Sequence, residues 1–152
     1  MTLALALALV AFILWFALRL HAHMWQRVAA RYRGKPSSDA IARKLEVAVI
    51  AARGLRTPDR FRNRDHRKYA GLLIDIHDEG LALSLVPLFN IMCPPLFLPF
   101  DEMGLKQTDW ALWREPYAIR MRQLPDTDII IGGVTVQWLR QHIDRAPFGL
   151  GV

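Results

Sequence analysis

The sequence predicts a membrane-anchored α+β protein: one N-terminal transmembrane helix, then a small antiparallel β domain with a C-terminal capping helix. Three observations predict this fold class. Residues 1–18 are uncharged and apolar apart from Thr2, alternation of apolar and polar residues begins at Leu72, and an amphipathic segment follows Thr135. The total length of 152 residues leaves room for one globular domain after the apolar segment.

We expect residues 1–20 to form the transmembrane helix. Residues 1–18 make a helix of roughly 27 Å, close to the roughly 30 Å hydrocarbon core of a bilayer. Trp15 and Arg19 are side-chain types that favour the membrane–water interface. A cleaved signal peptide is the alternative interpretation. It is disfavoured because basic residues do not precede the apolar run and residues 19–23 make a poor cleavage site.

The orientation of this helix follows from the charges beside it. Residues 19–68 contain 14 basic and 4 acidic residues, whereas residues 69–152 contain 6 basic and 10 acidic residues. Basic residues close to a transmembrane helix stay on the cytoplasmic side. The sequence therefore predicts a single-pass protein of a bacterial inner (plasma) membrane, with its N-terminus outside and its C-terminal domain in the cytoplasm.

Residues 21–35 are predicted to be a juxtamembrane basic helix. The apolar residues of this segment recur at helical spacing among arginines: Trp25, Val28, Ala29 and Tyr32. The sequence Gly34-Lys35-Pro36 should end the helix. Residues 36–152 then form the cytoplasmic domain.

The first segment of that domain allows two interpretations. Ser37 or Ser38 could cap a helix over residues 39–53, with Gly54 just beyond its end. Residues 45–52, however, are almost continuously apolar, which also suits a buried strand. The sequence alone leaves helix and strand open for residues 45–52.

The rest of the domain is predicted to be mainly β-structure. A half-buried strand at 72–76 leads through a turn at 78–80 to a second strand at 81–86. Further strands are expected at 96–100, 110–114, 117–124 and 128–131, with a turn at 125–127. Thr135 should cap a last helix over 136–143, in which Leu139 and Ile143 share one face.

Two stretches of this β region point to a family. The residues DEGLALS at 78–84 and PPLFLPFDEM at 94–103 resemble small uncharacterised bacterial proteins whose domain is similar to a PH-like (pleckstrin homology) or GRAM-like fold. Trp25 to Tyr32 is loosely similar to an N-terminal W-x-x-L-A-x-x-Y helix of that family. The resemblance implies a bent antiparallel sheet capped by the C-terminal helix, and it implies no enzymatic activity. Residues 45–52 have no place on that template.

The sequence offers no convincing catalytic, cofactor or metal site. The densest potential metal ligands are Asp75, His77, Asp78 and Glu79, which are better explained as the polar face of a hairpin and its turn. His21 and His23 lie about 200° apart on a helix and cannot chelate one ion. We therefore expect a protein that is not an enzyme and binds neither a cofactor nor a metal.

The strongest charge pattern is the basic run at residues 53–68. Its cationic members are Arg53, Arg56, Arg60, Arg62, Arg64, Arg67 and Lys68. A contact with anionic lipid headgroups or with an acidic partner is the favoured interpretation. A solvated loop remains the alternative, and binding of nucleic acid is not expected because no recognised motif accompanies the charges.

Residues 86–95 are predicted to be an exposed docking loop. Pro87, Pro94 and Pro95 prevent this segment from pairing as a central strand. Four of its side chains are nevertheless apolar: Leu88, Phe89, Ile91 and Met92. Exposed apolar surface of this kind usually marks a contact with protein or membrane.

Two functions are compatible with these patterns. The favoured hypothesis is a non-catalytic accessory subunit that interacts with a larger membrane complex. The alternative is a membrane-tethered PH-like module that binds anionic lipid.

Overall fold

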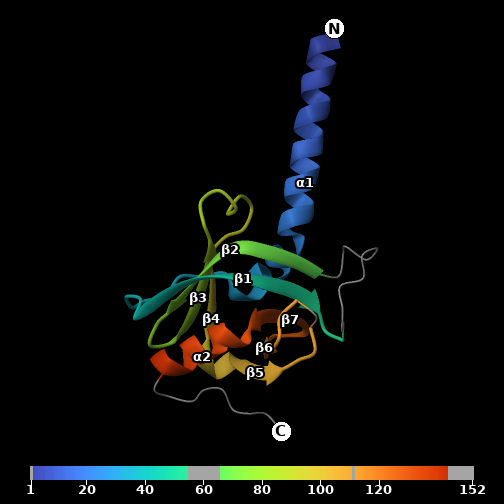
Figure 1. Ribbon diagram of the computed structural model, residues 1–152. Coiled ribbons are helices and arrows are strands. Elements are labelled where there is room, and N and C mark those ends of the chain that lie inside the picture. Colours follow the sequence, from blue (N-terminus) through green and yellow to red (C-terminus); the bar gives the residue numbers. More distant parts are fainter. Residues whose placement is uncertain (1, 55–65, 111, 144–152) are drawn as a thin grey trace.

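The computed structural model describes residues 2–54, 66–110 and 112–143. A long helix, α1 (Thr2–Tyr32), projects from a β domain, so that the N-terminus lies far from the rest of the molecule (Figure 1). The domain consists of a curled antiparallel sheet with a short helix, α2 (Gly133–His142), at the end of the described chain. The predicted α+β class, with an N-terminal apolar helix and a C-terminal helix, is confirmed.

The helix α1 has an exposed half and a buried half. Large apolar side chains are exposed from Leu3, at 73%, to Phe16, at 51%. After Leu20 the helix enters the domain, where Trp25 is only 1% exposed. The predicted transmembrane and juxtamembrane helices therefore form one helix, which ends before Gly34 as expected. Among the described residues this is the one helix long and apolar enough to cross a membrane.

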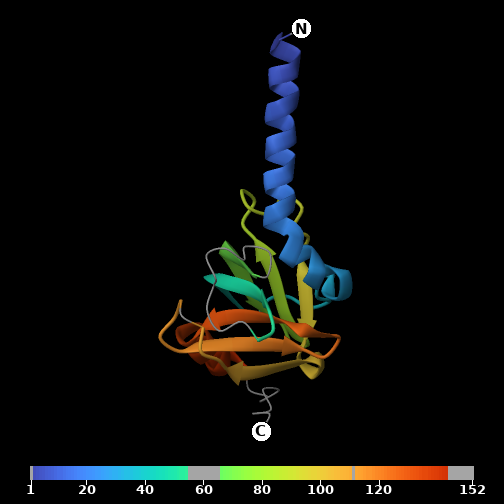
Figure 2. The same cartoon turned by 90° about the vertical axis from the view of Figure 1, so that its right-hand side faces the viewer.

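Seven strands form one antiparallel sheet in the described part of the chain, in the order β4-β3-β2-β1-β7-β6-β5. Their bounds are β1 (Ala42–Ala52), β2 (His66–Ile76), β3 (Gly80–Leu85), β4 (Leu96–Pro99), β5 (Met103–Gln107), β6 (Pro116–Met121) and β7 (Leu124–Gly132). A 3-10 turn, η1 (Phe100–Glu102), connects the two edge strands β4 and β5. Figure 2 shows the sheet curling into a shape close to a barrel.

The main core lies inside this curled sheet. The sheet contributes buried side chains such as Leu72, Ile74 and Leu98, and α2 contributes Val136 and Leu139. The second half of α1 completes the core with Ala22, Met24, Trp25, Val28, Ala29 and Tyr32. Residues 21–32 are thus part of the domain interior and not only a connection to it.

A smaller core covers the opposite face of the sheet. Trp110, on the connection between β5 and β6, packs over Val49, Ala51 and Ile130 with Trp113 beside them. One prediction fails here. The described residues of the predicted strand at 110–114, which are 110 and 112–114, do not form a strand, because the connection crosses the sheet face here instead of pairing with an edge.

The predicted helix over residues 39–53 is also wrong, and the strand alternative is right. Strand β1 is the centre of the sheet and pairs with β2 on one side and β7 on the other. Ala48 and Ile50 face the main core, whereas Val49 and Ala51 face the smaller one. A strand buried on both faces reads as a continuous apolar run, which is the pattern that 45–52 shows.

Two local predictions near the C-terminus need correction. The turn lies at Arg122 and Gln123, and residues 125–127 belong to β7 instead of forming the predicted turn. Thr135 does not cap α2. The helix begins at Gly133 with Gly132 as its N-cap, and the Thr135 hydroxyl donates a hydrogen bond to the Glu46 carboxylate on β1.

Tyr69 on β2 connects α1 to the sheet through the helix backbone. Its hydroxyl donates to the His21 carbonyl oxygen at 2.8 Å and accepts from the Trp25 amide at 3.0 Å. In a straight α-helix these two backbone groups bond to each other. A side chain inserted at such a position bends a helix, and α1 changes direction where it enters the domain (Figure 2).

Candidate interaction site

The loop at residues 86–95 connects β3 to β4 and lies beside α1 in both orthogonal views (Figures 1 and 2). Two tight turns shape it. The Phe89 amide donates to the Val86 carbonyl at 2.8 Å, and the Cys93 amide donates to the Asn90 carbonyl at 2.9 Å. These two hydrogen bonds therefore define the path of the loop backbone.

Hydrogen bonds attach this loop to α1. The Trp25 indole N–H donates to the Pro94 carbonyl at 2.7 Å, and the Gln26 side-chain amide donates to the Met92 carbonyl. The Gly34 amide donates to the Pro95 carbonyl at 3.3 Å. Nearer the exposed half of the helix, the His21 imidazole lies against the Phe89 backbone.

The four predicted docking residues are all exposed. Leu88 is 77% exposed and Met92 40%, and Phe89 and Ile91 lie between these values. Met92 also has a positive φ of 61°, a conformation that costs a non-glycine residue about 1–3 kcal/mol. Cys93 differs from its neighbours because it is buried in the main core, and burial raises the pKa of its thiol to about 11.

Gly71 on β2 supports the base of the loop. Its φ is +71°, and a Cβ atom at this position would lie 2.8 Å from Val86 Cγ2 and 3.2 Å from Phe89 Cδ2. The register between β1 and β2 shifts at this point, opposite Glu46 and Ala48. The sheet therefore bulges here, and only a glycine lets Phe89 approach the backbone of β2 this closely.

The structure describes only part of the predicted basic site. Arg56, Arg60, Arg62 and Arg64 lie outside the described residues. Arg53 forms an ion pair with Asp128 at 3.4 Å, and Arg120 approaches the same carboxylate at 3.6 Å.

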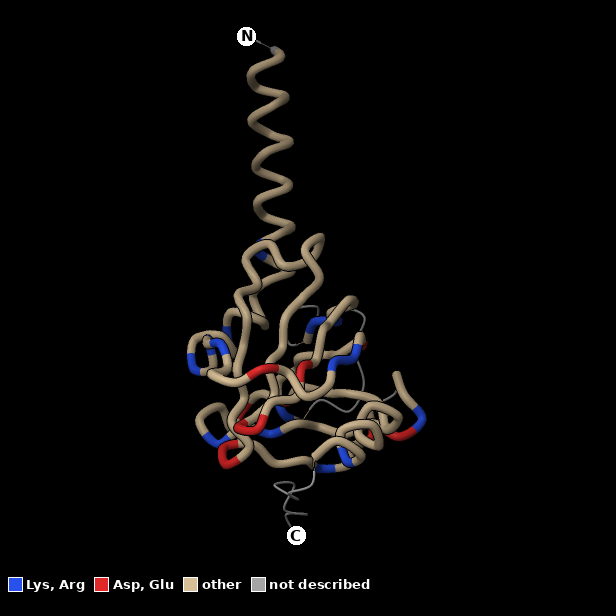
Figure 3. Tube along the Cα trace, turned by 90° about the vertical axis from the view of Figure 1, so that its left-hand side faces the viewer, with Lys and Arg blue, Asp and Glu red and all other residues tan. Residues whose placement is uncertain are grey.

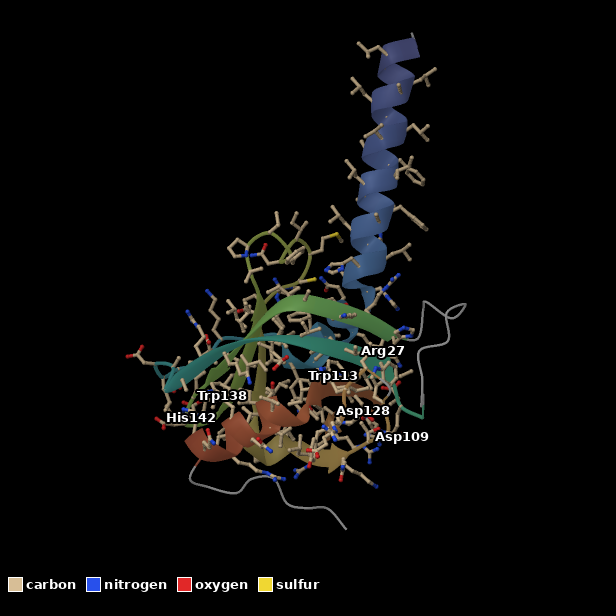
Figure 4. All side chains as sticks on the ribbon, in the orientation of Figure 1. Arg27, Asp109, Trp113, Asp128, Trp138 and His142 are labelled. Carbon is tan, nitrogen blue, oxygen red and sulfur yellow. The ribbon has the colours of Figure 1, made fainter. Side chains whose placement is uncertain are left out.

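The described cations of this run come from neighbouring strands. Ala51 on β1 lies opposite His66 on β2. Arg53 therefore follows β1 at the end of the sheet where Arg67 and the exposed Lys68 belong to β2. Figure 4 shows Asp128 at the same end as Arg27.

The outer half of α1 has no charged residues among those described, and the first ones occur where the helix meets the domain (Figure 3). Arg19 is the first of them, and its guanidinium lies 5.2 Å from the centre of the Trp15 ring. Exposed Arg31, Arg33 and Lys35 follow at the end of the helix. Arg27 pairs instead with Asp126 on β7.

A cleft beside the start of α2 was not predicted from the sequence. This cleft has a volume of about 540 Å³ and lies between β1, β7 and the connection before β6. Trp113 forms one wall and contacts the backbone at Gly132 (Figure 4). Glu46 lines it but is already used, because its carboxylate accepts from Thr135 and from the Val47 amide at 2.9 Å.

The acidic and histidine residues near the 78–80 turn serve the fold. Asp75 receives two hydrogen bonds from the Arg43 guanidinium, at 2.6 and 2.7 Å. His77 Nδ1 donates to the Ser38 carbonyl at 2.9 Å, and Glu79 accepts from Ser37. Within the described residues, no group of three or more His, Cys, Asp or Glu side chains is placed to hold a metal ion.

Comparison with known proteins returned no match to a family model, a curated protein or a solved structure. The PH-like assignment therefore stays a prediction.

Proposed function

We propose that this chain is a non-catalytic single-pass membrane protein that serves as an accessory subunit of a larger membrane complex. In this proposal α1 spans the membrane, and the PH-like domain lies against its cytoplasmic face. The observation that supports it most strongly is the passage of one helix from a wholly exposed apolar half into the domain core.

The exposed half of α1 is unsuited to water. Removing a Leu or Phe side chain from water is worth about 1.5–3 kcal/mol. The exposed large apolar side chains of this half are Leu3, Leu5, Leu7, Leu9, Val10, Phe12, Ile13, Leu14, Trp15 and Phe16. A bilayer supplies the apolar surroundings that such a helix needs, and one of this length can cross it.

The surface of this half also suits a partner helix. Phe12, Trp15 and Phe16 gather on one side, with ring centres 6.1 and 6.3 Å from Phe12. Alanines alternate with leucines over residues 3–9, and small side chains let helices approach closely in lipid. The basic residues at the domain end of α1 favour a cytoplasmic domain.

Native gel electrophoresis after extraction in mild detergent, followed by mass spectrometry of the bands, tests the accessory role. We expect the full chain to migrate with a defined larger assembly. In a matched variant, residues 3–18 are replaced by an unrelated apolar helix of equal length. This variant should remain in the membrane fraction but lose the assembly. A full chain that migrates alone as a monomer contradicts the accessory role.

The charge distribution supports a second candidate function, binding of anionic lipid by the basic run at residues 53–68. Each cation near an anionic membrane surface contributes about 1 kcal/mol at low salt. The full chain with Arg60, Arg62 and Arg64 changed to Gln should therefore hold fewer anionic lipids through detergent extraction. A variant with Arg140, on α2, changed to Gln is the matched control. Equal lipid retention by both variants contradicts this function.

A further inference from the structure

We propose that the loop at residues 86–95 is a second membrane contact, which places Leu88, Phe89, Ile91 and Met92 in the interfacial layer of the leaflet that α1 leaves. This inference rests on the proposed anchoring by α1. It assigns the exposed loop to lipid rather than to a protein partner.

The direction of the loop is the first argument. The loop projects from the domain along α1, towards the exposed half of that helix (Figures 1 and 2). A membrane crossed by α1 therefore lies on the side of the domain to which the loop points. The helix α2 lies at the opposite side (Figure 1).

The contacts with α1 show how far the loop reaches. Met92 and Pro94 are bonded to Gln26 and Trp25, whereas the Phe89 backbone lies against His21. Four or five residues of helix correspond to about 6–8 Å. The loop thus rises along α1 towards the Arg19–Trp15 pair, whose side chains are typical of the membrane interface.

The chemistry of the loop fits this layer. Residues 86–96 contain no charged side chain. The four large side chains are exposed, whereas Cys93 and Leu96 at the base are buried. Interfacial membrane contacts bury such apolar side chains about 5–10 Å into the boundary between headgroups and acyl chains.

The loop is also built to hold these side chains outward. Its two turns, the positive φ at Met92 and the close approach of Phe89 to Gly71 define its shape before any contact is made. Little ordering entropy is therefore lost when it meets a surface. The bilayer is the occupant we assign, because α1 already holds it beside the loop.

Site-specific fluorescence in reconstituted vesicles tests this inference. The full chain carries Cys93→Ala and one new cysteine, Ile91→Cys or Leu88→Cys, labelled with an environment-sensitive dye. The vesicles are mixed phosphatidylcholine and phosphatidylglycerol, with or without nitroxide on the lipid acyl chains. Phe16→Cys in α1 and Val134→Cys in α2, where Val134 is 74% exposed, are the matched controls.

We expect nitroxide lipid to quench the loop labels several-fold more than the Val134 label, and aqueous iodide to quench them several-fold less. Loop labels that iodide reaches as readily as the Val134 label overturn the inference. Loop labels shielded from both quenchers also overturn it, because they indicate contact with protein, here a second copy of the chain.

The Phe16 label separates this inference from the anchoring on which it depends. If nitroxide lipid quenches Phe16 but not the loop, the anchor stands and the loop inference fails. If neither is quenched, the proposed anchoring itself fails. A parallel set of variants that retains Cys93, whose buried thiol labels slowly, guards against loss of folding through Cys93→Ala.

Discussion

At the scale of single residues, Tyr69 is the side chain on which the path of α1 depends most. Its hydroxyl stands between the His21 carbonyl and the Trp25 amide, and burial raises the pKa of its phenol. Tyr69→Phe would remove the hydroxyl with which both of these buried backbone groups form hydrogen bonds. Such a loss costs about 1–3 kcal/mol.

We therefore expect Tyr69→Phe to lower the thermal midpoint of the full chain in detergent micelles by several degrees. Tyr117→Phe, on the half-buried β6 tyrosine, is the matched control and should change it less. Equal midpoints for the two variants would mean that the bend in α1 does not need the Tyr69 hydroxyl.

Cys93 gives a pH-dependent prediction. Its pKa of about 11 lies above the roughly 8.5 of an exposed thiol, so the folded state favours the protonated form. The resulting contribution to stability is complete below about pH 8.5 and falls as the pH rises towards 11. At pH 8 its thiolate fraction is about two hundredfold below that of an exposed thiol, and alkylation should slow accordingly. Mass spectrometry of the iodoacetamide-treated chain measures this, and fast labelling without denaturant would contradict the burial of Cys93.

Some residue-level features were accessible from the sequence and others were not. Proline spacing and an apolar composition indicated that Leu88 and Ile91 are exposed, and they are. The role of Tyr69 had no local signal, because the backbone groups it bonds lie 44 and 48 residues away. Thr135 had a strong local signal that misled, since Glu46 on a distant strand offered its hydroxyl a better acceptor.

At the scale of elements, the first half of α1 is exposed and the second half lies in the domain core. The chain should therefore tolerate truncation only between these two halves, near residue 20. The buried residues of α1 include Met24, Trp25, Val28 and Tyr32. Replacing one buried aromatic residue by Ala costs about 3–5 kcal/mol, so a small domain cannot lose all of these and stay folded.

We expect a fragment of residues 20–152 to fold and a fragment of residues 36–152 to remain unfolded. Circular dichroism and a cooperative thermal transition distinguish the two. A cooperative transition in residues 36–152 would show that the sheet and α2 suffice for the core. Trp25→Ala in the longer fragment is the intermediate case and should retain a transition at a lower temperature.

The element predictions succeeded where a sequence pattern is compatible with only one type of secondary structure. The hairpin of β2 and β3 has period-2 alternation on both sides of a turn, so its place is set locally. The segment that became β1 is apolar on both faces, and such a pattern fits a buried helix equally well. Only its pairing with both β2 and β7 decides for a strand, and that pairing depends on residues far along the chain.

At the scale of the whole molecule, the charge distribution predicts one orientation. In the sequence, Arg19, Arg31, Arg33 and Lys35 follow the apolar half of α1 and precede the first strand. A reporter fused after the C-terminus should therefore be active only if it works in the cytoplasm. A reporter active on the outer side contradicts the proposed orientation. In a fusion with Arg31, Arg33 and Lys35 changed to Gln, the difference between cytoplasmic and outer reporter activity should be smaller.

The fastening of α1 to β7 also bears on how the protein is made. Tyr32 bonds to Gln123 and Arg27 to Asp126, so α1 leaves the ribosome before these partners, which follow 91 and 99 residues later. At about 5–20 residues per second this delay is roughly 5–20 s. In a chain anchored as proposed, the bilayer already holds the start of α1 during that time. The sheet then closes around the second half of α1, whose position is already set, and folding is completed at the membrane surface and not in free solution.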